Sequence, residues 1–235
     1  MKAIILAAGR GSRMQDWTDD RPKCMIELRG KPLLEWQLDA LTHAGISEIA
    51  VVTGYKREAL AYKGLVEFHN PRWANTNMVS SLACAAEWLE KDTCVVSYSD
   101  IVYSANAVTS LMNCSCDIAV TYDINWQALW EKRFGDPLID AETFRMHPDG
   151  TLAEIGNKPR SAEEVEGQYM GLLRYSPAGW AEVERIRKEL TGSARDSIHM
   201  TGMLQRVIDA GRVAVHAIPY REEWGEFDSK RDMTN

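Results

Sequence analysis

Apolar runs and amphipathic stretches alternate along the first half of the chain. Short apolar runs at residues 3–6, 48–53 and 93–98 are typical of buried strands. Pro32 opens an amphipathic stretch to about His43, which predicts a helix stopped by the glycine that follows. The alternation continues with a helix at 56–62, a strand at 66–68, a helix from 75–77 to 89, a helix at 104–112 and a strand at 117–122. This order predicts a mixed α/β fold with a mostly parallel sheet and helices on both faces.

The second half of the chain changes character. Residues 142–146 and 152–155 flank Pro148-Asp149-Gly150, which predicts a β-hairpin closed by ordinary turn residues. A strand at 169–175, helices at 179–190 and 199–210, and a last strand at 213–218 follow. Because no repeat or linker divides the chain, we expect a single domain over residues 1–235 with a small β-rich substrate lobe.

Composition narrows the class of protein. The 235 residues are 45% hydrophobic, which is enough for a substantial core. A formal net charge of −7 argues against binding to nucleic acid, because a phosphate backbone calls for a basic stripe. The apolar N-terminus is too short for a signal peptide, and no stretch is long enough to span a membrane.

The cysteines and histidines do not indicate a disulfide-linked or zinc-binding protein. The cysteines are odd in number and lack a paired spacing, which argues against a disulfide framework. The histidines are scattered, without the spacing of metal ligands. We therefore expect reduced thiols and a cytoplasmic protein.

The strongest local signal lies directly after the first apolar run. Gly9-Arg10-Gly11-Ser12-Arg13 lets the backbone approach a phosphate chain, and its successive N–H groups can form an anion nest. Arg13 can bind phosphate oxygens, and Lys23 can contact an α-phosphate as negative charge develops on it. By itself a Gly-x-Gly loop also fits an ordinary surface turn. It matches neither a P-loop nor the three-glycine dinucleotide fingerprint.

Three segments together resemble the sugar-phosphate and phosphocholine nucleotidyltransferase superfamily: residues 2–14, then Arg21-Pro22-Lys23-Cys24-Met25, then residues 30–34. The resemblance implies a Rossmann-like fold in which the glycine loop wraps a nucleoside triphosphate. It assigns transition-state stabilisation to Arg13 and Lys23. The implied nucleotide contacts in the loop are Leu6, Ala7, Ala8, Gly9, Gly11 and Ser12.

Residues 70–82 indicate the branch of that superfamily. Their asparagine-rich sequence is similar to the segment of phosphocholine cytidylyltransferases and their phosphonate-handling relatives. The similarity places Asn77 and Ser81 near the base and the acceptor, although Asn77 also fits a plain helix cap. The backbone at Gly54 is expected to read the base. Ser99 stands where sugar nucleotidyltransferases usually have glycine, which argues mildly against a sugar acceptor.

Two aspartates are expected to hold Mg²⁺. Asp100 follows the run at 93–98, at the edge where open α/β sheets bind ligands. Trp224-Gly225-Glu226-Phe227-Asp228 resembles the closing motif of the superfamily, whose aspartate is the second metal ligand. Either aspartate alone could also cap a helix. Because the acceptor oxygen is already an anion, the expected in-line attack on the α-phosphorus needs no general base.

The acceptor pocket is the least defined part. Trp126 and Trp130, with Asp140 and Glu142 nearby, fit an aromatic and acidic pocket for a choline or aminoethyl group. Tryptophans four residues apart also fit an ordinary amphipathic helix. Family resemblance adds Lys158 for the acceptor phosphate, and Glu166 and Tyr169 as substrate contacts, with Thr201 a weaker suggestion. His199 replaces a more acidic residue expected in phosphonate-handling relatives.

Three functions remain open from the sequence. The leading one is a CTP-dependent cytidylyltransferase for phosphocholine, 2-aminoethylphosphonate or a similar small zwitterion, and family analogy suggests a homodimer. The second is a sugar-1-phosphate nucleotidylyltransferase that uses UTP or dTTP. The third is a non-catalytic nucleotide-binding protein. The third is disfavoured because such proteins tend to lose one of the four charged residues, and all are present as Arg13, Lys23, Asp100 and Asp228.

Overall fold

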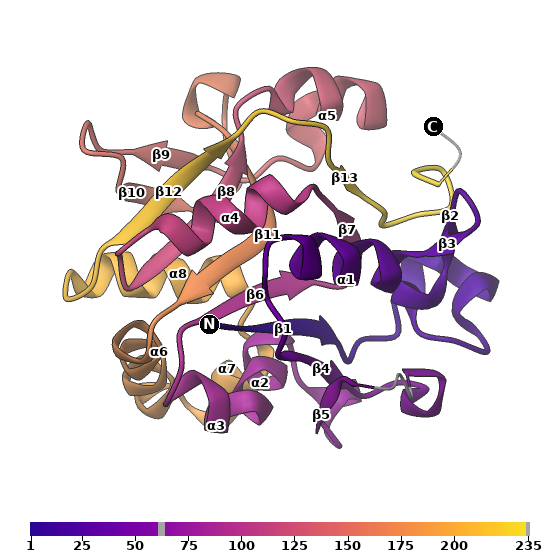
Figure 1. Ribbon diagram of the computed structural model, residues 1–235. Coiled ribbons are helices and arrows are strands. Elements are labelled where there is room, and N and C mark those ends of the chain that lie inside the picture. Colours follow the sequence, from indigo (N-terminus) through magenta and orange to yellow (C-terminus); the bar gives the residue numbers. More distant parts are fainter. Residues whose placement is uncertain (61–63, 234–235) are drawn as a thin grey trace.

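A mixed sheet forms the centre of the molecule (Figure 1). The computed structural model describes residues 1–60 and 64–233. Within them, seven strands hydrogen-bond in the order β12-β8-β11-β6-β1-β4-β5. These are β12 (Val215–Tyr220), β8 (Ile118–Asp123), β11 (Gln168–Tyr175), β6 (Cys94–Tyr98), β1 (Lys2–Ala7), β4 (Ile49–Thr53) and β5 (Val66–His69).

Most neighbouring strands in this sheet are parallel, as the sequence predicts. The pairs β6–β1, β1–β4, β4–β5 and β8–β12 all run in the same direction. Only β11 among these described strands is reversed, and it is antiparallel to both β6 and β8. Its reversal brings the start of β11 to the edge of the sheet where β6 ends.

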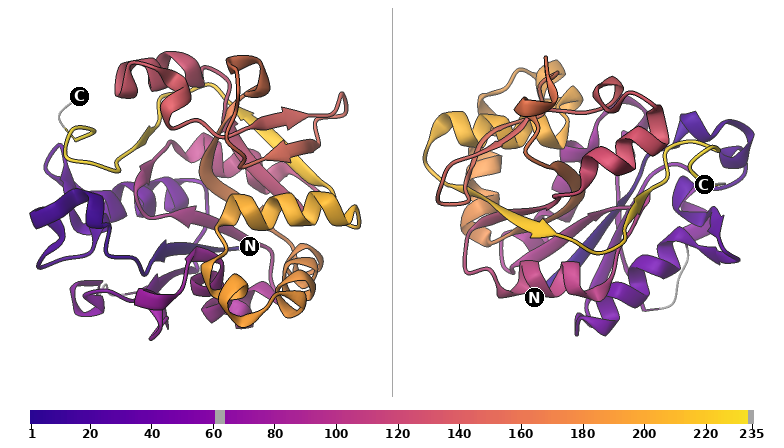
Figure 2. Two further views of the ribbon diagram at one scale, coloured as in Figure 1. Left: turned by 180° about the vertical axis from the view of Figure 1, so that it is seen from behind. Right: turned by 90° about the horizontal axis from the view of Figure 1, so that it is seen from above.

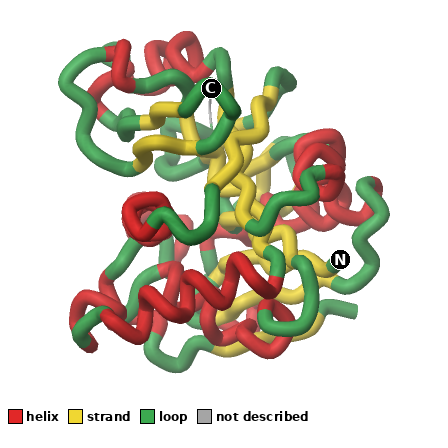
Figure 3. The backbone as a smooth tube through the Cα atoms, turned by 90° about the vertical axis from the view of Figure 1, so that its left-hand side faces the viewer, coloured by secondary structure: helices red, strands yellow, loops and turns green. Residues whose placement is uncertain are grey.

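Both faces of the sheet are buried. Ile4 and Leu6 belong to one apolar cluster, whereas Ala3 and Ile5 of the same strand belong to another. Alternate side chains of a strand point to opposite faces, so helices must cover both. Figures 2 and 3 show helices on either side of the sheet. The predicted α/β fold class is confirmed.

The helices divide between the two faces. The cluster that contains Ile5 is covered by α1 (Leu33–His43), α4 (Ala105–Asn113) and α5 (Trp126–Phe134). The cluster that contains Ile4 is covered by α2 (Met78–Leu82), α3 (Ala86–Leu89), α6 (Pro177–Glu189) and α8 (Met200–Ala210), and α7 (Gly192–Ser197) lies against α2. Two of them begin at polar caps: Ser104 accepts a hydrogen bond from Asn106 N, and Ser176 accepts one from Gly179 N.

Three small two-stranded sheets complete the fold. The predicted hairpin is present as β9 (Phe144–Met146) and β10 (Leu152–Ile155), with Gly150 at φ 82° in its turn. β2 (Glu27–Leu28) pairs with β3 (Lys31–Pro32). β7 (Ile101–Val102) pairs with β13 (Gly225–Glu226), which brings the C-terminal segment beside the end of β6.

Two predicted helices differ in the structure. The helix expected to run to residue 89 is divided into α2, a 3₁₀ turn at Ala83–Ala85 and α3. Ser81 Oγ and Cys84 Sγ donate to carbonyls four residues earlier, an arrangement that bends helices. The helix expected at 56–62 is a 3₁₀ turn at Arg57–Leu60, and its predicted end lies outside the described residues.

The expectation of reduced thiols is wrong for one pair of cysteines. Cys114 and Cys116 form a disulfide just after α4. Cys24, Cys84 and Cys94 are free thiols. The two bonded cysteines are separated by one residue, a spacing that the sequence analysis did not treat as a pair.

In the part of the chain that the structure describes, every helix is too short or too polar to cross a lipid bilayer.

Gly179 allows α6 to approach the sheet closely. A Cβ atom there would lie 2.5 Å from the carbonyl oxygen of Asp117 and 2.7 Å from Ile118 Cγ1. We expect Gly179→Ala to lower the free energy of unfolding by about 1–3 kcal/mol, because backbone must move to relieve the overlap. Gly202→Ala is the matched control, since its Cβ would meet only Ile198 Cγ1 at 3.7 Å. Urea unfolding of both variants measures the effect, and equal midpoints would contradict the close approach.

Candidate active site

The glycine loop packs tightly onto Lys23. Gly11 has φ 69°, and a Cβ atom there would lie 2.8 Å from Lys23 Cβ. Glycine therefore serves two needs at this position: it adopts the left-handed conformation, and it leaves room for the lysine stem. Gly9 has open space around its missing side chain. The loop thus fixes the course of Lys23 and leaves its outer surface free for a ligand.

A cavity of about 220 Å³ opens beside this loop, at the carboxyl ends of β1 and β6. This is the edge of an α/β sheet where ligands bind. The predicted residues that line it are Leu6, Ala8, Gly9, Gly11, Arg13, Lys23, Asn77, Ser81, Ser99 and Asp100. Trp73, Thr76, Met78 and Tyr98 also line the cavity and were not proposed as site residues from the sequence.

Three predicted nucleotide contacts lie away from the cavity wall. The side chain of Ala7 belongs to the apolar cluster on the opposite face. Ser12 is exposed at the start of a 3₁₀ turn. Gly54 lies behind the wall, where a Cβ atom would meet the Ala8 carbonyl oxygen at 2.5 Å and Trp73 Cβ at 2.6 Å. Gly54 therefore sets the close packing of Trp73 against the loop.

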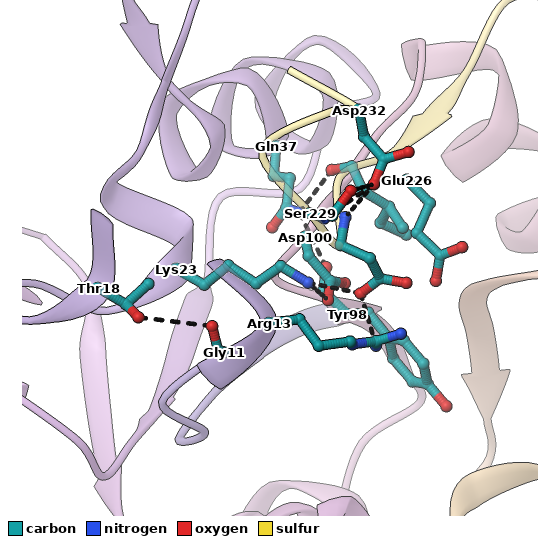
Figure 4. Close-up of polar contacts among 12 residues, drawn as sticks. Gly11, Arg13, Thr18, Lys23, Gln37, Tyr98, Asp100, Glu226, Ser229 and Asp232 are labelled. Carbon is teal, nitrogen blue, oxygen red and sulfur yellow. Dashed lines mark hydrogen bonds and ion pairs between the residues drawn. The ribbon is translucent and has the colours of Figure 1, made fainter. Parts of the chain in front are cut away.

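Four charged residues meet at one end of the cavity (Figure 4). Lys23 Nζ lies 2.7 Å from Asp100 Oδ2 and 2.7 Å from Asp228 Oδ1. Arg13 Nη2 donates to the same Asp228 oxygen at 2.8 Å. Burial disfavours the charged ammonium of Lys23, but the two carboxylates outweigh it, and its pKa is raised above the ordinary 10.5.

This cluster suits a divalent cation. The ammonium of Lys23 stands between two carboxylates as a cation would. Asp100 Oδ1 is buried and has no hydrogen-bond partner among the described residues. Carboxylate oxygens are the ligands that Mg²⁺ prefers. The described residues offer no group of three or more His, Cys, Asp or Glu side chains for a metal ion, so water and phosphate oxygens would have to supply the other ligands.

Asp228 is held beside Asp100 by the backbone of the C-terminal segment. Phe227 N donates to the carbonyl oxygen of Asp100 at 2.9 Å, next to the β7–β13 pair. Asp228 is buried, and it does not cap a helix as the sequence alone allowed. A fixed backbone contact thus sets the separation of the two carboxylates.

Behind Thr76 and Ser81, at one end of the cavity, lies a polar residue that was not proposed from the sequence. Asn70 is buried, and its Nδ2 donates to Thr76 Oγ1 at 2.9 Å and to Ser81 Oγ at 3.0 Å. Asn77 is the N-cap of α2, since its Oδ1 accepts from Met78 N at 2.7 Å, and it also lines the cavity. Capping and lining therefore coexist at Asn77.

A second polar group lies beyond Tyr98. The ring of Tyr98 meets the ring of Tyr169 edge to face, with centroids 5.8 Å apart. Burial raises the pKa of Glu142, while Thr201 and His199 oppose the shift. Burial, then the charge of Asp228, likewise raise the pKa of Asp140. Glu142, which is half-buried, thus lies where a cation would relieve the cost of burial, whereas Asp140 is exposed.

The prediction that Trp126 and Trp130 line the acceptor pocket is wrong. Their exposed fractions are 5% and 1%. Trp126 Nε1 donates to the carbonyl oxygen of Val165 at 3.1 Å, and Trp130 stacks on Trp224 with centroids 6.1 Å apart. The alternative of an amphipathic helix is the one that the structure shows, with the indoles facing the core.

Two other residues predicted to contact the acceptor form hydrogen bonds with backbone atoms in the structure. Lys158 Nζ donates to the carbonyl oxygens of Leu138 and, at 2.8 Å, Ile139. Glu166 accepts from Met146 N at 2.6 Å, so its carboxylate supports the β9–β10 hairpin. Neither contact excludes a ligand, but neither residue is among those that line the cavity.

Comparison with known families agrees with this geometry. Residues 3–175 match the model of the MobA-like NTP transferase domain. The protein belongs to this family. The nucleotidyltransferase is 37% identical to CTP:phosphoglutamine cytidylyltransferase of Campylobacter jejuni, over 99% of this chain and 98% of that protein. It is also 36% identical to 2-aminoethylphosphonate cytidylyltransferase of Lancefieldella rimae, over 43% of this chain and 44% of the relative.

A solved structure shares the fold of this nucleotidyltransferase. CTP:phosphocholine cytidylyltransferase from Streptococcus pneumoniae superposes with a TM-score of 0.76 at 21% identity, over 99% of this chain and 96% of the other. The predicted superfamily, its cytidylyltransferase branch and the enzyme class are therefore confirmed. Members of this family generally use a divalent metal ion.

The Lys23 ammonium should stabilise the enzyme in the absence of metal. We expect Lys23→Met to lower the free energy of unfolding by about 3 kcal/mol, because it leaves Asp100 without a counter-ion and Asp228 with Arg13 as its nearest cation. Mg²⁺ should then stabilise this variant more than the wild type. Lys31→Met is the control, since it removes a partly exposed ion pair with Asp39 and a contact with the Trp36 ring, and it should cost less than about 1 kcal/mol. Equal losses in the two variants, measured by urea unfolding with and without Mg²⁺, would contradict this role.

Proposed function

We propose that this protein transfers CMP from CTP to a small phosphorylated or phosphonate acceptor and releases pyrophosphate, with Mg²⁺ as cofactor. The observation that carries the proposal is the meeting of Arg13, Lys23, Asp100 and Asp228 beside the glycine loop. Two cations and two carboxylates beside the glycine loop suit a reaction at a negatively charged phosphate.

The chain's own residues supply charge and position for this reaction. An oxygen of the acceptor phosphate or phosphonate attacks the α-phosphorus, the bond to the β-phosphate oxygen breaks, and pyrophosphate leaves. Lys23 and Arg13 stabilise the negative charge that develops at the α-phosphate. Asp100 and Asp228 would hold Mg²⁺, which neutralises phosphate charge when bound. The attacking oxygen carries no proton, so no side chain has to act as a base.

The choice of CTP rests on the relatives and on the base side of the cavity. The relative that spans almost the whole chain is named as a CTP-dependent enzyme. Thr76 and Ser81 line this end of the cavity, and buried Asn70 orients their hydroxyl groups, which can meet the polar edge of a pyrimidine. Trp73 lies beside them and gives the base an apolar surface.

The acceptor side favours a compound with an amino or ammonium group. Glu142 is a half-buried carboxylate whose charge acts on Tyr98 and Tyr169, and the rings of these two tyrosines pack edge to face. Carboxylates and aromatic rings together attract an ammonium group. Phosphoglutamine, 2-aminoethylphosphonate and choline phosphate, the acceptors named for three relatives, all carry such a nitrogen.

Pyrophosphate release in the presence of Mg²⁺ tests the proposal. CTP, UTP, ATP and GTP are each combined with phosphoglutamine, 2-aminoethylphosphonate, phosphocholine and glucose-1-phosphate. We expect turnover with CTP and one of the three nitrogen-bearing acceptors. Turnover confined to UTP and glucose-1-phosphate would replace the proposal with a sugar nucleotidyltransferase.

Glu142 should control the affinity for the acceptor and leave that for the nucleotide unchanged. We expect Glu142→Gln to raise KM for the acceptor about tenfold or more, because a desolvated carboxylate no longer meets the ammonium group. KM for CTP should change less than about twofold. Glu163→Gln, at an exposed position in a nearby turn, should change neither value. Steady-state kinetics with each substrate varied decides the question, and a shift in KM for CTP alone would assign Glu142 to the nucleotide.

A further inference from the structure

Arg133 at the end of α5 is a buried cation outside the cavity. Its exposed fraction is 7%, and it is not among the residues that line the cavity. Its guanidinium lies 5.0 Å from the ring centroid of Trp130 and 4.9 Å from that of Phe134. Trp130 in turn stacks on Trp224. Packing therefore holds the guanidinium against the C-terminal segment 224–232, which we call the strap.

The guanidinium binds the strap on both sides of Asp228. Nη1 donates to Glu226 Oε2 at 2.9 Å, and Nε donates to Asp232 Oδ1 at 3.1 Å. Nη2 lies 3.9 Å from Asp228 Oδ2 and makes no hydrogen bond among the described residues. Arg133 thus bridges two carboxylates of the strap and adds positive charge near the third without binding it.

Asp232 links the guanidinium of Arg133 to the backbone of Asp228. Its Oδ2 accepts from Asp228 N at 3.1 Å, and from Ser229 N and Ser229 Oγ at 2.8 Å each. Figure 4 shows Ser229 and Asp232 together beside Asp100. One carboxylate therefore ties the guanidinium to the turn that presents Asp228. The other anchor, Glu226, lies in β13, which pairs with β7 next to Asp100.

The strap has little regular secondary structure of its own to fix its shape. Beyond the two residues of β13 it forms no regular helix or strand in the described part of the chain. It also gathers Glu226, Asp228 and Asp232 within seven positions, beside Asp100, so like charges oppose its folded course. A buried cation that touches two of the three offsets this repulsion.

We propose that Arg133 is a positioning residue that fixes Asp228 for binding of the divalent metal. It acts through the strap and touches no reacting group. The inference rests on the proposed function, because it takes Asp228 to be a metal ligand. Lysine cannot fully replace arginine here, since one ammonium cannot span Glu226 and Asp232 as the planar guanidinium does.

Binding of Mn²⁺ to the full-length protein tests this, with free Mn²⁺ measured by electron paramagnetic resonance. We expect Arg133→Gln to raise the Kd for Mn²⁺ about tenfold, the scale on which residues behind a metal ligand act. Arg133→Lys should give a smaller increase. The Mg²⁺ concentration for half-maximal turnover should rise in parallel, while kcat at saturating Mg²⁺ recovers most of its value.

Arg185→Gln is the matched control for a general loss of stability. Arg185 also bonds to a buried carboxylate, with Nη2 2.7 Å from Glu182 Oε1, but it lies on α6. The Arg185→Gln variant should leave the Kd for Mn²⁺ unchanged. An equal increase in Arg133→Gln and Arg185→Gln would overturn the proposal, as would an unchanged Kd in folded Arg133→Gln. If Arg133→Gln does not fold, Arg133→Lys decides in the same way, by an increased or an unchanged Kd.

Asp228→Asn separates this inference from the proposed function. It should weaken Mn²⁺ binding at least as strongly as Arg133→Gln. Undiminished binding in Asp228→Asn would remove Asp228 from the metal site and overturn the inference with it, whatever the nucleotide specificity proves to be. Loss of Mn²⁺ binding in Asp228→Asn, with Arg133→Gln equal to wild type, would keep the metal site and reject only the role of Arg133.

Discussion

The ion-pair group of Lys23 with Asp100 and Asp228 is the constraint on which the rest of the active site depends. It joins three distant parts of the chain, because the lysine follows the glycine loop, Asp100 lies just after β6 and Asp228 lies on the strap. A buried group of this kind brings little net stability, since desolvation offsets the Coulomb attraction. Its value is positional: the charges that a nucleoside triphosphate and its metal require are already assembled before either binds.

The direction of the strands decides what faces this group. The parallel strands β1 and β6 bring the glycine loop and Asp100 to one edge of the sheet. The reversed strand β11 begins where β6 ends, so Tyr169 lies against Tyr98 at that same edge. Gly171 has φ 80° and leaves room for the Tyr98 ring, whose Cδ2 would lie 2.7 Å from a Cβ atom there. The regions proposed for the nucleotide and the acceptor are therefore adjacent because one strand of the sheet runs in the opposite direction.

The cationic side chains around Asp228 are each paired with carboxylates. The chain as a whole is acidic, yet Arg13, Lys23 and Arg133 all lie within reach of Asp228. This arrangement places the metal-binding aspartate of the proposed mechanism in a network that spans α5, the glycine loop and the strap. Changes far from the cavity, such as at the Trp130–Trp224 stack, can therefore reach the chemistry through the strap.

The sequence by itself determined the features that depend on neighbouring residues. The buried strands, the phosphate loop after β1 and the helix cap at Asn77 each follow from local composition and periodicity. The structure alone decided which faces meet. Tryptophans at 126 and 130 share a helix face in either interpretation, but only the packing of a strap almost a hundred residues later shows that this face is buried. The direction of β11 and the position of Arg133 were likewise set by tertiary contacts. Periodicity fixes which side chains lie together on an element, whereas burial and charge pairing depend on what the folded chain brings against them.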